Sequence, residues 1–191
     1  MPLTPPGIAS TMTAAFAGVA FTGVGIPQLS LAIGTGVTLW TSSTLLVATV
    51  DVGTLGVGAG SFPCLIPQPL LMSGMMTGLA SNGLAGTASP QLAAALANGL
   101  ALAFSSQGLI VTAHPTVGIG TATVTFPGPS AIPAMLAGFA SAGLTGISVP
   151  QMASAVGMGL DIAFASFVLP IPIIGSPSPF PSGGVGTGKI V

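Results

Sequence analysis

The side chains that could carry acid–base, nucleophilic or metal chemistry are few in this sequence. Its 191 residues include a single basic residue, two acidic residues, one His and one Cys. They are Asp51, Cys64, His114, Asp161 and Lys189. Acid–base catalysis and metal binding need several such groups that converge on one point. Because these five residues are almost all of the titratable or metal-ligating side chains in the chain, we expect no enzymatic activity, no metal site and no cofactor.

Each of these residues also has a plain structural explanation. His114 precedes Pro115 with no Cys, Asp or Glu nearby, which is typical of a histidine in a turn, although three symmetry copies could converge on one ion. Cys64 has no second cysteine and no basic neighbour, so we expect a structural thiol. Asp161 falls within a predicted helix, where a carboxylate would bond to a nearby hydroxyl or backbone group. We expect Asp51 to be an ordinary carboxylate at a strand end or in a turn.

The segment that ends at Lys189 comes close to a nucleotide-binding motif. Residues 183–189 nearly follow the phosphate-binding loop, in which glycines and a lysine precede a Ser or Thr. Ile190 replaces that metal-binding hydroxyl, and the glycines belong to a repeat. We therefore expect no nucleotide binding here.

The chain contains an internal threefold repeat with a period of about sixty residues. A Pro-Gln pair followed by Leu or Met occurs three times, and a glycine follows nine positions after each of these prolines. Further along, each copy reaches a Val-Gly-x-Gly sequence. The repeat-defining residues are Pro27, Gln28 and Gly36, then Pro90, Gln91 and Gly99, then Pro150, Gln151 and Gly159, with the glycine pairs Gly58 and Gly60, Gly118 and Gly120, and Gly186 and Gly188. We divide the chain into an N-terminal extension at 1–9 and repeats at 10–69, 70–130 and 131–191.

Each repeat is expected to contain two short helices followed by strands. The first helix is predicted near 10–23, 71–84 or 133–145 and closes on a glycine. The second begins at the repeat Pro, with Ser89 and Ser148 as possible caps, and runs to about residue 43, 106 or 166. Strands are expected at 45–52 and 109–114, with a return strand at 120–126 that completes a hairpin.

The third repeat departs from this pattern after its second helix. Its residues 169–182 form a Pro-rich insertion, and prolines at 170 and 172 argue against a central strand. The sequence thus predicts an α+β fold of three tandem pseudo-repeats, each with two helices and a β-hairpin, arranged about a pseudo-threefold axis. A linear solenoid is the alternative.

The composition also limits what can surround the chain. Only 2% of the residues are charged, whereas half are hydrophobic. A compact chain of this length exposes roughly 8,000 Å², which so few charged side chains cannot cover. We therefore expect that protein copies or partners cover much of this surface, that it faces lipid, or that the isolated chain aggregates. With a net charge of −1 and no basic cluster, direct nucleic-acid binding is not expected.

In its neutral Gly-, Ala- and Pro-rich character the chain resembles virion structural proteins of tailed phages, particularly small tail or baseplate parts. This resemblance covers general character and carries no functional residues with it. It implies a non-enzymatic structural component that packs by apolar, uncharged surfaces. Its partners would be copies of itself and other structural proteins, in a virion assembled in the host cytoplasm.

An integral membrane or pore-forming protein is the alternative function. Residues 27–50, 90–113 and 150–173 are each long enough to span a bilayer and contain at most one charge. However, no Lys or Arg flanks them to set an orientation, and Trp40 is the only Trp available for an interfacial belt.

Overall fold

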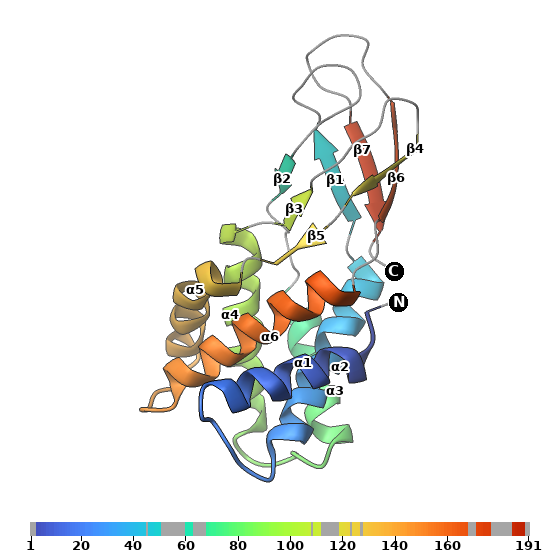
Figure 1. The fold of residues 1–191 in the computed structure, drawn as a ribbon. Coiled ribbons are helices and arrows are strands. Elements are labelled where there is room, and N and C mark those ends of the chain that lie inside the picture. Colours follow the sequence, from blue (N-terminus) through green and yellow to red (C-terminus); the bar gives the residue numbers. More distant parts are fainter. Residues whose placement is uncertain are drawn as a thin grey trace.

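A computed structural model describes residues 3–44, 46–50, 60–62, 68–107, 109–111, 119–122, 124–126, 128–167, 171–176 and 185–189. Side chains are described for 3–42, 68–103, 105, 126 and 128–166. Six helices dominate this part of the chain, as Figure 1 shows.

The helices come as three consecutive pairs of matching lengths. The first members are α1 (Pro5–Gly18), α3 (Gln68–Ser81) and α5 (Gly128–Ser141), each with 14 residues. The second members are α2 (Ile26–Thr44), α4 (Ser89–Gln107) and α6 (Val149–Phe167), each with 19 residues. The pairs recur with the spacing of the sequence repeat.

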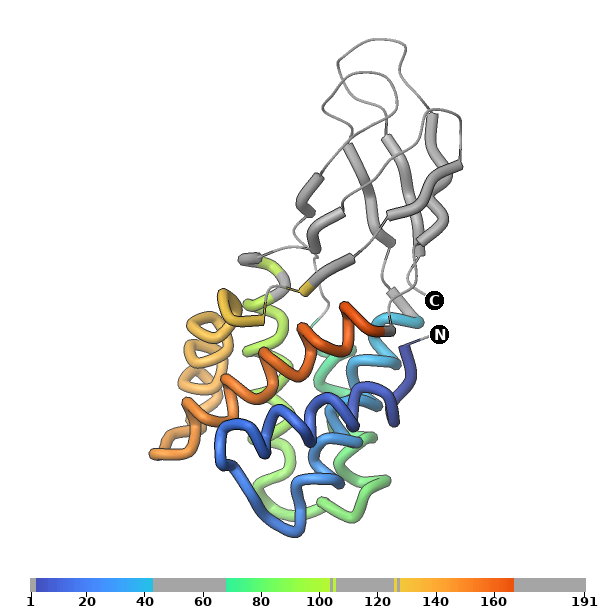
Figure 2. Tube along the Cα trace, in the orientation of Figure 1, coloured from blue at the N-terminus to red at the C-terminus, as the bar shows by residue number. Residues whose placement is uncertain are grey.

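The six helices form a closed ring. Each helix packs against the next one along the chain, and α6 returns to pack against α1, as the trace in Figure 2 shows. A linear solenoid would leave its first and last helices apart. The solenoid alternative is therefore excluded for the helical part of the chain.

The first helices begin earlier than the sequence patterns predict. α1 starts at Pro5, inside the predicted N-terminal extension, and the hydroxyl of Thr4 accepts a hydrogen bond from Gly7 N–H at 3.3 Å. α5 starts at Gly128 and contains Pro133, which was predicted to begin it. Pro5 and Pro6 are tolerated because they lie in the first turn of α1, where a missing N–H has no partner in any case. Pro133 lies inside α5, beyond its first turn, so taking this proline as a boundary placed the start of α5 several residues too late.

The turn inside each pair has the same backbone hydrogen bonds in all three repeats. The residue after the turn donates from its N–H to a carbonyl five positions back, as in a Schellman motif. The residue directly before this N–H donor has a positive φ, which is 56° at Ala20 and 74° at both Gly83 and Gly143. The bonds run from Phe21 to Phe16 at 3.0 Å, from Leu84 to Leu79 at 2.9 Å and from Leu144 to Phe139 at 2.9 Å.

The repeat glycines of the second helices mark equivalent close contacts between neighbouring repeats. Each one faces a methionine, at an equivalent position, on the first helix of the next repeat. A Cβ atom placed on Gly36 would lie 2.6 Å from Met75 Sδ. The same atom on Gly99 would lie 3.1 Å from the Met135 carbonyl oxygen, and on Gly159 it would lie 2.8 Å from Met12 Sδ. The last of these contacts joins α6 to α1, so the same contact closes the ring.

The described core consists of apolar layers contributed by all three repeats. Positions six and ten residues after the repeat Pro are buried in every copy. They are Ile33, Leu96 and Val156 in one layer and Val37, Leu100 and Leu160 in the next, each with 0% of its surface exposed. Because no water-sized space touches these side chains, the ring is packed at this level.

The prediction of an α+β fold with a β-hairpin in every repeat is wrong. Apart from a few flanking residues, the side chains that the structure describes lie in the six helices and their turns, so the described core is all-helical. Short strands are described by their backbone alone. They are β1 (Leu46–Val50), β2 (Gly60–Phe62), β3 (Leu109–Val111), β4 (Ile119–Ala122), β5 (Val124–Thr125), β6 (Ile171–Ser176) and β7 (Val185–Lys189).

These strands pair mainly between repeats, in the orders β1-β7-β6-β4 and β2-β3-β5. Within the described backbone, β1 pairs with β7 and β2 with β3, so the first repeat has no hairpin of its own. β6 lies between two neighbours with Pro172 opposite Thr121, contrary to the expectation that this segment could not be central. β-branched residues indicate an extended chain and glycines indicate a turn, but neither selects the partner strand.

Candidate functional site

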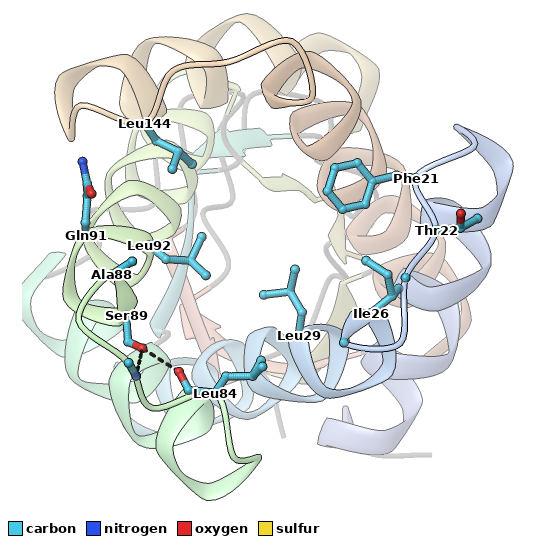
Figure 3. Close-up of a pocket in the computed structure, with 13 residues that line it drawn as sticks. Phe21, Thr22, Ile26, Leu29, Leu84, Ala88, Ser89, Gln91, Leu92 and Leu144 are labelled. Carbon is cyan, nitrogen blue, oxygen red and sulfur yellow. Dashed lines mark hydrogen bonds between the residues drawn. The ribbon is translucent and has the colours of Figure 1, made fainter.

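A hollow opens at the end of the ring where the turns within the helix pairs lie. It consists of two adjoining cavities of about 570 Å³ and 410 Å³, which share Phe21, Leu92 and Leu144 in their walls. Figure 3 looks into this end, and the labelled apolar side chains point toward the middle of the ring. We call this hollow the apolar bowl.

The walls of the apolar bowl follow the threefold repeat. One tier lies six residues before the repeat Pro and the other lies two residues after it. The tiers are Phe21, Leu84 and Leu144, and Leu29, Leu92 and Met152. Every repeat therefore contributes one large apolar side chain to each tier, and the bowl lies on the pseudo-threefold axis of the helices.

The apolar bowl is closed at its base. Leu29, Ile33 and Val37 are four residues apart on α2, so they lie along one face of the helix. Leu29 lines the bowl, whereas Ile33 and Val37 are completely buried. The equivalent positions on α4 and α6 are buried as well, so the layer beneath Leu29 forms a floor.

Two of the polar side chains in the wall, Ser89 and Gln91, are hydrogen-bonded within the chain. Thr22, Thr145 and Ser148 also line the hollow. Ser89 Oγ accepts from Gly86 N–H at 2.7 Å and donates to the Leu84 carbonyl at 2.5 Å. Ser89 was predicted to cap α4, but it is the first residue of that helix and bonds back into the turn.

Gln91 connects two repeats at the edge of the bowl. Its Nε2 donates to the carbonyls of Ala142 and Gly143, each at 3.2 Å, at the C-terminal end of α5. Helix C-termini leave carbonyl groups without intrahelical partners. Gln91 thus satisfies carbonyls of the next repeat, and its amide nitrogen is engaged.

The rim of the apolar bowl is apolar and exposed. Val24 and Ile147 occupy equivalent positions three residues before the repeat Pro, and they are 97% and 95% exposed. The second repeat has Thr87 at the same position. The rim therefore presents two large apolar side chains to water.

Asp161 is the only ionisable side chain among those that the structure describes. It is half-buried on α6, and this burial raises its pKa above the ordinary value of 3.8. The predicted hydrogen bond to its carboxylate is not found among the described residues. Its Cβ packs against the start of α5, where a Cβ at Gly128 would come within 2.8 Å. Asp161 does not line the apolar bowl.

The other residues considered for chemistry do not join Asp161 in the described part of the chain. Asp51, Cys64, His114, Gly58 and Gly118 lie outside the described residues. Gly60 is in β2, Gly120 in β4, and Gly186, Gly188 and Lys189 are in β7, so the lysine end of the near-match to a phosphate-binding loop is a strand. Within the described ranges, no group of three or more His, Cys, Asp or Glu residues could hold a metal ion.

The sequence contained a signal for the apolar bowl that was not used to predict it. Large apolar residues recur at both wall positions in all three repeats, beside the Pro-Gln pairs that defined the repeat. Pro27, Pro90 and Pro150 are each the second residue of their helix. They mark the end of the ring at which the bowl opens.

Comparison with protein families, curated proteins and solved structures found no match to this chain.

Among the described residues, no helix is both long enough and apolar enough to cross a lipid bilayer.

Proposed function

We propose that this protein is a non-enzymatic structural component of a large assembly and that it associates through uncharged, apolar surfaces. The observation that carries this proposal is the bowl end of the ring, where exposed Val24 and Ile147 surround an apolar hollow. Copies of the chain and other structural proteins are the proposed partners. Among such assemblies, the character of the sequence favours the tail or baseplate of a phage virion.

The physical argument rests on apolar area and on charge. Burying a Val or Ile side chain stabilises a contact by about 1.5–3 kcal/mol relative to leaving it in water. No ionised group is described on the bowl end to oppose such a contact, because Asp161 does not line the bowl. Leu102 and Ile162, at equivalent positions of α4 and α6, expose 43% and 48% of their surfaces and offer further apolar contacts.

The contribution of the rim to association can be tested by replacing its two large apolar residues with Thr, which the second repeat carries at this position. We expect Val24→Thr with Ile147→Thr to weaken association by about 2 kcal/mol, or roughly thirtyfold in dissociation constant. Thr87→Val is the matched control in the opposite direction and should strengthen association. Sedimentation velocity over a range of concentrations measures both effects. A wild-type chain that stays monomeric at high concentration, with neither variant changing it, would refute the proposal.

Fractionation of the native source tests the larger claim. We expect the chain to remain with a large particle through detergent and carbonate washes. Release into detergent as a small, separate complex would contradict this and favour the membrane or pore-forming alternative.

A further inference from the structure

We propose that the apolar bowl is a binding site for one small, uncharged, apolar molecule. Its larger cavity, about 570 Å³, falls in the range of cavities that hold drug-sized ligands. The walls come from three repeats and the floor is closed, so a ligand would contact all three repeats at once. This inference concerns the interior of the bowl and does not depend on the proposed role in an assembly.

The chemistry of the wall determines the class of ligand. Leu29, Leu92 and Leu144 offer only hydrocarbon surface, and no side chain that lines the bowl is ionisable. A charged ligand would lose its hydration without gaining a counter-charge, which is strongly unfavourable. The described side chains of the bowl therefore select a neutral molecule over an anion or a cation of the same shape.

The hydrogen-bonding groups of the wall narrow the class further. Ser89 Oγ already accepts from one backbone group and donates to another. Gln91 Nε2 is engaged by two carbonyls of the next repeat. A ligand that requires hydrogen bonds from these two atoms would have to break existing ones, so neither of them favours a polar ligand.

A ligand in the larger cavity leaves the rim exposed. Val24 is not part of the wall, and Ile147 lines only the smaller cavity. A filled bowl would give the end of the ring a continuous apolar surface. Ligand binding is therefore compatible with a protein partner at the same end.

Two dyes of one framework test the proposal on the unmodified protein. N-phenyl-1-naphthylamine is neutral, and 1-anilinonaphthalene-8-sulfonate adds a single sulfonate to it. We expect the neutral dye to bind saturably with one site per chain, with enhanced fluorescence, and about tenfold or more tighter than the sulfonate. Equal affinities, or no saturable binding of the neutral dye, would overturn the proposal.

A filling variant then locates the site. Leu84→Phe with Leu144→Phe places at both positions the residue that the first repeat carries as Phe21, so the added volume enters the bowl without a charge. We expect binding of the neutral dye to weaken about tenfold or more, because the cavity no longer holds it. The matched control is Leu102→Phe, which adds the same volume on the flank of α4 and should leave binding unchanged.

Two results with these variants would overturn the proposal. Weaker binding in the Leu102→Phe variant, or unchanged binding in the filled variant, would place the dye elsewhere and overturn the proposal. Urea unfolding of each variant checks that the fold is retained. If the filled variant does not fold, the ratio of affinities for the two dyes on the wild-type chain still decides the question. Failure of dye binding leaves the sedimentation test of assembly unaffected, so the two proposals fail separately.

Discussion

Replacing Gly138 with alanine tests the close crossing of α5 and α4, on which the ring depends. A Cβ atom at Gly138 would overlap the backbone nitrogen and Cα of Gly99 and the carbonyl carbon of Asn98. These are all backbone atoms, so no change of side-chain rotamer can relieve the overlap. The two helices must separate, and the layers packed beside the crossing must follow.

The expected change in the free energy of unfolding follows from two opposing effects. Overpacking a well-packed core typically lowers stability by about 1–3 kcal/mol, and a clash between two backbones belongs at the upper end. Alanine gains about 1 kcal/mol over glycine inside a helix. We therefore expect Gly138→Ala to lower the free energy of unfolding by about 2 kcal/mol, or about 4–8 °C in melting temperature for a chain of this size.

Urea unfolding followed by far-ultraviolet circular dichroism measures this change. Gly18→Ala is the matched control, because a Cβ at Gly18 meets no atom within 4 Å. That variant should be as stable as the wild type or slightly more stable.

The first repeat makes the Gly138 experiment discriminating. It carries Ala15 at the position equivalent to Gly138, so the repeat alone predicts that alanine is tolerated there. The described packing predicts that it is not. A Gly138→Ala variant as stable as the wild type would refute the close crossing of α4 and α5.

Three further variants test individual interactions by urea unfolding. Burial raises the pKa of Asp161 above 3.8, so the folded chain holds this proton more tightly than the unfolded chain, and stability is lost as pH rises from the ordinary value through the raised pKa. Asp161→Asn should remove that loss, and a difference from the wild type that is constant with pH would contradict the assignment. Gln91→Ala removes the donor to two carbonyls and should lower stability by about 0.5–1.5 kcal/mol; an unchanged midpoint would show that this contact contributes nothing. Ser89→Ala leaves two turn groups without their partner and should lower stability by about 1–3 kcal/mol; if it has no effect, the hydroxyl does not hold the turn.

The helical part of the fold could be predicted from the sequence because its signals are local. The glycines at Gly83 and Gly143 supply the positive φ that ends a helix, and the repeat prolines mark the next start. The second helices were predicted within a residue or two of their observed ends. The first helices were placed too late, and in α5 the reason is that Pro133, which lies inside the helix, was taken for its start.

The strands and the apolar bowl could not be predicted in the same way, because both depend on contacts between repeats. The pairing of β1 with β7 joins opposite ends of the chain, and nothing in the five residues of β1 selects that partner. The bowl exists only because α6 returns to α1. Phe21 and Leu144 become walls of one hollow through that closure, although the recurrence of apolar residues at their positions does not show which residues they will face.

Ring closure also limits how the chain can assemble. The contact of Gly159 with Met12 repeats the contacts of Gly36 with Met75 and of Gly99 with Met135. The face that the third repeat would offer to a fourth is therefore covered by the first. Copies of this chain cannot extend one another by stacking repeats, as an open solenoid could. Contacts with partners must use the ends or the flanks of the ring, and the bowl end is where the described structure exposes its most accessible large apolar side chains.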